Sequence, residues 1–136
     1  MGGAILSGLL ASGTSCDGIT VTNRTEAKAA GLRTEGVVSL SHETTRDANR
    51  EAVRGARIVL LGVKPAMILD LVREVADALE PDAVLVSVAA GVTIGSMEEL
   101  VPQGVLRAMP NTPAIVRRGV TGLAAGSRVT AEDAAL

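Results

Sequence analysis

The chain has 136 residues, 47% of them hydrophobic, with no Phe, Tyr or Trp and a formal net charge of −2. The lack of aromatic side chains and of a basic tract argues against nucleic-acid binding, and no apolar run reaches the roughly 20 residues that span a bilayer. A single cysteine excludes an intrachain disulfide, and a single histidine excludes a metal site built from several histidines.

These counts favour one domain of a cytoplasmic protein whose core is built from aliphatic side chains. Cys16 lies beside a predicted turn and His42 lies in a polar stretch, so both are interpreted as surface residues. The first helix lacks a basic region ahead of it, so we expect no signal peptide. Fifteen glycines are typical of helices and strands that pack closely, as in an α/β layer fold.

The first half of the chain predicts alternating helices and strands. A helix is expected over residues 2–12, because Ile5, Leu6, Leu9 and Leu10 recur at helical spacing. The next elements are a strand over 19–22, a short helix that ends at Gly31, a strand over 35–40 and a polar, helix-compatible stretch that ends near Gly55.

The second half begins with a continuous apolar run over 56–63, which is typical of a strand buried on both faces in a parallel sheet. A helix is predicted to start at Pro65, since proline suits the first helical turn. Its apolar stripe consists of Ile68, Leu71, Val72, Val75 and Leu79.

The remaining elements follow the same alternation. Strands are expected over 83–90, 104–109 and 119–126, and a short helix is expected from a Thr93 cap to about residue 101. Pro110 and Pro113 predict a loop after the strand over 104–109. A last helix is expected to begin with Thr130 as its cap.

This order predicts an α/β fold, a doubly wound and mostly parallel sheet with right-handed crossovers. Residues 1–126 form the predicted domain, and residues 127–136 begin a helix that leads out of it.

In open α/β sheets a ligand binds at the carboxyl ends of the strands. The residues there are small, polar or backbone-exposing, which favours binding of a large polar cofactor over acid–base hydrolysis. They fall at 23–25, 62–65, 89–92 and 109–113.

The segment Asn23-Arg24-Thr25 offers an amide, a guanidinium and a hydroxyl where NAD-binding folds place an acidic residue on the ribose 2′-hydroxyl. These groups can meet a 2′-phosphate, with Arg24 as a charged fork. The distance from Gly2 to Asn23 also matches the roughly twenty residues expected between phosphate turn and ribose contact. A polar turn with Thr25 as a helix N-cap explains the residues equally well.

The other three strand ends differ in how strongly they indicate a site. "GVKP" is either an ordinary strand-to-helix connection with a solvated Lys64 or a segment that lines the cofactor. "AAGV" either allows a helix and a strand to pack closely or presents a flat backbone surface to a cofactor ring. "MPNTP" favours function, because two prolines fix an extended loop in which Asn111 and Thr112 supply the hydrogen-bonding side chains.

Together these segments resemble pyrroline-5-carboxylate reductase, the last enzyme of proline synthesis. The resemblance rests on "MGGAILSGLL", "ARIVLLGVKP", "VLVSVAAGVTI" and "LRAMPNTPAIVRRGVTGL", which run in order over essentially the whole chain. It implies a Rossmann-type domain, followed by a helical dimerisation domain. It also implies reduction of 1-pyrroline-5-carboxylate to L-proline with NAD(P)H.

The resemblance also implies roles for individual residues. Gly2 matches the last glycine, and Met1 the methionine, of a G-x-G-x-M-G phosphate element. NADP(H) is preferred over NAD(H), with the implied cofactor contacts at Gly2, Asn23, Arg24, Thr25, Asn49, Val63, Lys64, Pro65, Ala89, Ala90 and Gly91. The junction between cofactor and substrate is implied at Met109, Asn111, Thr112 and Pro113. No catalytic residue and no metal ligand is assigned.

The first strand and the leading glycines of that domain, and the helical domain through which the family forms homo-oligomers, are expected to lie outside these 136 residues. We therefore expect the chain alone to be inactive. Two alternatives remain: another dehydrogenase of the same Rossmann class, such as a prephenate or F420-dependent NADP oxidoreductase relative, and a non-catalytic nucleotide-binding module. "MPNTP" argues against the first alternative.

Overall fold

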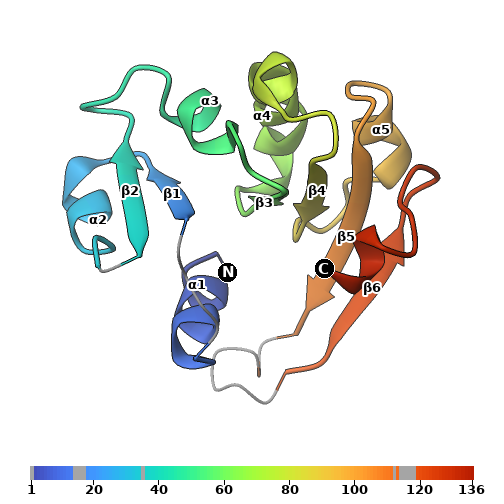
Figure 1. Cartoon of the computed structure of the whole chain (residues 1–136), viewed down its shortest axis with the longest axis horizontal. Coiled ribbons are helices and arrows are strands. Elements are labelled where there is room, and N and C mark those ends of the chain that lie inside the picture. Colours follow the sequence, from blue (N-terminus) through green and yellow to red (C-terminus); the bar gives the residue numbers. More distant parts are fainter. Residues whose placement is uncertain (1, 14–17, 35, 112, 114–118) are drawn as a thin grey trace.

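The computed structural model describes residues 2–13, 18–34, 36–111, 113 and 119–136 (Figure 1). Their strands form two hydrogen-bonded sheets, one of order β1-β2 and one of order β3-β4-β5-β6. Every pairing is parallel except that of β5 with β6. The predicted α/β fold with a mostly parallel sheet is therefore confirmed, with a break in the pairing between β1 and β3.

The first sheet pairs β1 (Ile19–Asn23) with β2 (Val37–Ser41) in a register that runs from Ile19 opposite Val37 to Asn23 opposite Ser41. Helix α2 (Glu26–Ala30) connects the two strands. It begins after Thr25, whose hydroxyl oxygen accepts a hydrogen bond from the Lys28 backbone N–H at 3.5 Å, and it ends at Gly31 as predicted. The side chain of Ala29 packs the helix onto the strands and is fully buried.

The second sheet contains β3 (Ile58–Leu61), β4 (Val84–Ser87), β5 (Gly104–Pro110) and β6 (Thr121–Ala125). The parallel register places Leu61 and Ser87, the last residues of β3 and β4, beside Arg107 in the middle of β5. All five residues of β6 are exposed, so the last predicted strand forms an open edge.

The predicted helix from Pro65 is divided into η1 (Pro65–Met67), α4 (Ile68–Val75) and η2 (Ala76–Ala78). Its predicted apolar stripe forms the centre of the core: Ile68, Val72 and Val75 are at most 1% exposed and Leu79 is 9% exposed. They pack with Leu61, Leu85 and Val105 from the second sheet and with Met97 from α5 (Ile94–Glu98). Thr93 caps α5 as predicted.

Two expectations from the sequence need correction. The polar stretch after β2 is helical only over α3 (Ala48–Val53), because residues 42–47 form turns. The run over 56–63 is not buried on both faces: in β3, Val59 and Leu61 are buried, whereas Ile58 and Leu60 are 48% and 40% exposed. The reason is that β3 pairs with β4 alone among the described strands and therefore forms an edge.

Helix α1 (Gly2–Ala11) begins at the carboxyl end of β3, where a side chain placed on Gly62 would lie 3.5 Å from the Gly2 Cα. Leu6 is its buried residue, while Leu9 and Leu10 remain 43% and 39% exposed. A cavity of about 520 Å³ separates the helix from the second sheet; residues that line it include Ile5, Leu60, Val88 and Ala108. In Figure 1 the N-terminal end of the helix lies between the two sheets. No helix in the described ranges combines the length and apolarity needed to cross a bilayer.

The C-terminal segment returns to the amino ends of the strands. The predicted last helix is a single turn, η4 (Asp133–Ala135), whose N-cap residue is Glu132 rather than Thr130; the Thr130 hydroxyl accepts from the Asp133 N–H at 3.1 Å. The Asp133 carboxylate pairs with the Arg57 guanidinium at 2.6 Å, just ahead of β3. This ion pair lowers the pKa of Asp133 to about 2, with help from hydrogen bonds donated by Thr130.

Replacement of Asp133 by Asn should release this segment. Because the folded pKa is depressed, the carboxylate stabilises the fold above the ordinary pKa of 3.8, and this stabilisation is lost as the pH falls from about 4 to about 2. Asp133→Asn should therefore lower Tm at pH 6 and raise amide exchange over 133–136 roughly tenfold. Glu132→Gln at the exposed neighbour is the matched control. A wild-type Tm advantage that persists unchanged at pH 2 would contradict this role.

Candidate functional site

Three of the predicted site segments meet at one edge of the second sheet. Val63–Pro65, Ala89–Gly91 and Met109–Asn111 follow or end the neighbouring parallel strands β3, β4 and β5. Lys64 is extended, with φ −62° and ψ 148°, and Pro65 occupies the first position of η1 as predicted. Lys64 and Pro65 are exposed and Val63 is half-buried, so this segment presents a charged and backbone-rich surface.

The segment after β4 is open on one side. Ala89 is buried and its N–H donates to the Ser87 hydroxyl oxygen at 3.3 Å, whereas Ala90 and Gly91 are exposed. Gly91 has φ +76°, a conformation that favours glycine, and no atom lies within 4 Å of the position that a Cβ would take. A flat group could therefore approach this backbone without meeting a side chain.

The segment after β5 has a structural role that the sequence did not reveal. The Asn111 side-chain Oδ1 accepts from the Val120 N–H at 3.0 Å, and the Asn111 N–H donates to the Val120 carbonyl at 3.3 Å. Asn111 therefore closes the base of the β5–β6 connection. Met109 and Pro113 are exposed, and Thr112 lies outside the described residues.

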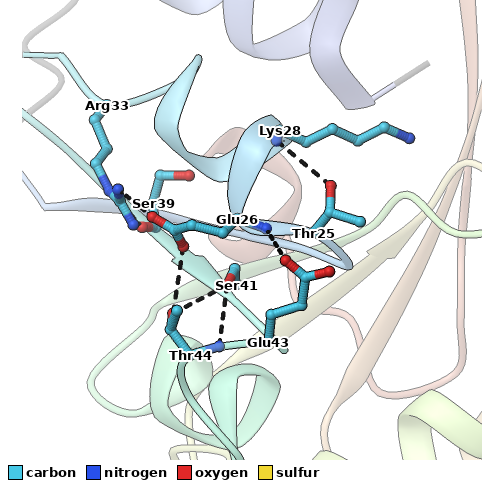
Figure 2. Close-up of polar contacts among 8 residues, drawn as sticks. All are labelled: Thr25, Glu26, Lys28, Arg33, Ser39, Ser41, Glu43 and Thr44. Atoms are coloured by element: carbon cyan, nitrogen blue, oxygen red, sulfur yellow. Dashed lines mark hydrogen bonds and ion pairs between the residues drawn. The ribbon is translucent and has the colours of Figure 1, made fainter.

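The end of β1 carries the segment that the sequence connects with a 2′-phosphate, and Figure 2 shows its last residue, Thr25. Arg24 is exposed, and the Thr25 hydroxyl acts as the cap of α2. The Asn23 side-chain Nδ2 is buried and has no hydrogen-bond partner among the described residues. An unpaired buried donor of this kind is costly, so a ligand acceptor here would stabilise the site.

The carboxylates of Glu26 and Glu43 lie near Thr25, as Figure 2 shows. Glu43 Oε2 accepts from the Glu26 N–H at 2.7 Å, and the Glu26 carboxylate pairs with Arg33 at 2.5 Å. The hydrogen bond from Arg33 lowers the pKa of Glu26. The Glu43 carboxylate thus adds negative charge at the first turn of α2, which follows Arg24 and Thr25. Nothing in the sequence indicated Glu43, because it belongs to the polar turn after β2.

Asn49 lies near the first sheet. Its Oδ1 accepts from the Thr22 hydroxyl at 2.8 Å, one residue before Asn23, and its Nδ2 donates to the Glu74 carboxylate at 3.1 Å and 3.3 Å. The predicted site residues therefore form two groups: Asn23–Thr25 with Asn49 at the first sheet, and the three strand ends of the second sheet with Gly2 beside Gly62. Met1 lies outside the described residues.

Comparison with known proteins identifies relatives for this arrangement. A family model described as "NADP oxidoreductase coenzyme F420-dependent" matches residues 1–91. Pyrroline-5-carboxylate reductase from Corynebacterium melassecola is 36% identical over 98% of this chain and 49% of its own length.

Solved structures give the same result. A pyrroline-5-carboxylate reductase from Coxiella burnetii superposes with a TM-score of 0.86 at 34% identity, over 97% of this chain and 48% of that chain. The Plasmodium falciparum pyrroline carboxylate reductase with NADP bound has the same fold, with a TM-score of 0.81 at 22% identity, over 99% of this chain and 48% of that chain.

The resemblance inferred from the sequence is thus confirmed. The chain spans about half the length of the curated relatives it matches. The family model covers residues 1–91, whereas the match to the reductases extends over 98% of the chain.

Substitution of Asn111 by Ala should loosen the base of the β5–β6 connection, because the Val120 N–H loses its acceptor. We expect amide exchange at Val120 to become roughly tenfold faster. Asn111→Asp keeps a side-chain acceptor and is the matched control, for which exchange should stay near the wild-type rate. Equal acceleration in both variants, or in neither, would show that the side-chain acceptor does not close the connection.

Proposed function

The chain belongs to the family described as "NADP oxidoreductase coenzyme F420-dependent", and we propose that the whole protein reduces 1-pyrroline-5-carboxylate to L-proline with NADP(H). The chain corresponds to the N-terminal NAD(P)-binding domain of pyrroline-5-carboxylate reductase. The observation that carries this proposal is the match to reductases over 98% of the chain, which includes all four strand-end segments. The cofactor supplies the hydride, and the residues of this chain bind and orient it.

The adenosine end of the cofactor is assigned to the first sheet. Arg24 is an exposed cation, and Asn23 holds a buried donor with no partner among the described side chains, so both fit an additional phosphate. Asn49 lies beside Thr22 at the same strand and is assigned to the ribose. The Thr25 hydroxyl already caps α2, so its assigned contact with the phosphate would be shared with the Lys28 N–H.

The rest of the cofactor is assigned to the second sheet. Gly2 begins a ten-residue helix beside Gly62, where backbone N–H groups would face the pyrophosphate. Val63, Lys64 and Pro65 would line the chain of the cofactor. Ala89, Ala90 and Gly91 would border the nicotinamide, for which the open backbone at Gly91 leaves room.

The junction with the substrate is assigned to Met109, Asn111, Thr112 and Pro113. Asn111 would hold this loop in place through Val120 while the prolines keep it extended. A protonated imine is already electrophilic, so the role of these residues is to orient the two reactants and exclude water rather than to act as a strong base.

Two further parts would complete the enzyme. The orders β2-β1 and β3-β4-β5 match the strand order 3-2-1-4-5-6 of dinucleotide-binding sheets with the central strand left out. We propose that one more parallel strand joins β1 to β3, and that a helical domain supplies the substrate site and the homo-oligomer interface.

Replacement of Arg24 by Ala tests the cofactor preference. If Arg24 pairs with the 2′-phosphate, the variant should bind NADPH roughly tenfold more weakly and NADH with unchanged affinity. Arg73→Ala is the matched control, because Arg73 is exposed and pairs with Asp70 on α4, away from this segment. Titration calorimetry with both cofactors gives the two dissociation constants. Unchanged NADPH affinity in Arg24→Ala would remove the proposed preference.

A further inference from the structure

Asn49 connects the two sheets through side-chain hydrogen bonds. From α3, its amide reaches Thr22 on β1 at 2.8 Å, His42 Nε2 at 3.2 Å and both carboxylate oxygens of Glu74 on α4 at 3.1 Å and 3.3 Å. Helix α4 is fixed to the second sheet by its buried apolar side chains. The position of Glu74 is therefore set by the second sheet, while Thr22 and His42 belong to the first sheet and the turn after it.

The chemistry of these partners determines which way the Asn49 amide points. An ionised carboxylate can only accept hydrogen bonds, so the NH₂ group of Asn49 must face Glu74. The carbonyl oxygen of Asn49 then faces β1, where it accepts from the Thr22 hydroxyl. Because this oxygen is an acceptor, His42 must carry its proton on Nε2 to donate to it.

We propose that Glu74 is a positioning residue of the cofactor site: it holds the Asn49 carbonyl oxygen toward the end of β1, where a ribose hydroxyl would take the place of one of its two present donors, Thr22 or His42. This inference rests on the proposed function, which places the adenosine ribose there. The proposal gives a role to Glu74, which lies outside the strand-end segments and on a helix that packs on the second sheet.

Other contacts between α3 and α4 keep the two helices together when Glu74 is changed. Arg50 pairs with Asp77 at 2.7 Å and also donates to the Glu74 backbone carbonyl at 3.3 Å. The Gly55 N–H donates to the Glu80 carboxylate at 2.9 Å. A substitution that alters only the Glu74 carboxylate therefore leaves the packing of the helices intact.

The test is Glu74→Gln, which keeps the size of the side chain but adds an NH₂ group to which the Asn49 oxygen can turn. We expect the affinities for NADPH and NADH to fall by the same factor, about threefold to tenfold, because both cofactors carry this ribose. In the neutral His42 ring, ¹⁵N NMR should show the proton moving from Nε2 toward Nδ1. A purely structural role of Glu74 would not move that signal.

Asp77→Asn is the matched control, because it breaks an ion pair one turn further along the same face and leaves the Asn49 amide untouched. It should change neither the His42 tautomer nor the cofactor affinities. Unchanged affinities in Glu74→Gln, with or without a tautomer change, would overturn the positioning role. If Arg24→Ala still weakened NADPH binding selectively, the proposed function would stand; if neither variant affected either cofactor, the proposed function would fail as well.

Discussion

The open edges of β1 and β3 are the constraint on which the rest of this structure depends. Each strand pairs on one side only among the described strands, which leaves backbone N–H and C=O groups without sheet partners along the other side. The exposed Ile58 and Leu60 on β3 and the mostly unburied helix α1 follow from the same break. A strand between the two edges would satisfy both rows of backbone groups at once.

The same break divides the proposed cofactor site. Its proposed adenosine end lies at β1, near Arg24 and the Asn23 Nδ2 that has no partner among the described residues. Its proposed nicotinamide end lies at the edge of β3, β4 and β5. Contacts that relate these halves to one another include the hydrogen bonds of Asn49 to Glu74 and the ion pair of Arg50 with Asp77. The geometry of a ligand that spans both sheets therefore depends on the residues that connect α3 to α4.

The sequence predicted the elements well, because helical spacing at Ile68, Val72 and Val75 and caps at Thr25 and Thr93 are local signals. It predicted the burial of β3 wrongly, because burial depends on which strands lie alongside. The strand ends were identifiable from chain order alone. The roles of Glu43, Glu74 and Val120 were not, since each contacts its partner across 9 to 25 residues of intervening chain and no local pattern marks it.

Amide hydrogen exchange at β1 and β3 is the measurement that tests the central claim most directly. For this test the chain is extended ahead of Met1 by an apolar strand of about five residues followed by a glycine turn. The matched control carries the same extension with a proline in the added strand, because proline cannot donate a backbone hydrogen bond to the sheet. If the added strand completes one sheet, amide exchange at the free edges of β1 and β3 should become roughly a hundredfold slower in the extended chain. In the control chain, exchange at these edges should stay unchanged. Equal exchange in both extended chains would contradict the claim that these edges receive a common strand.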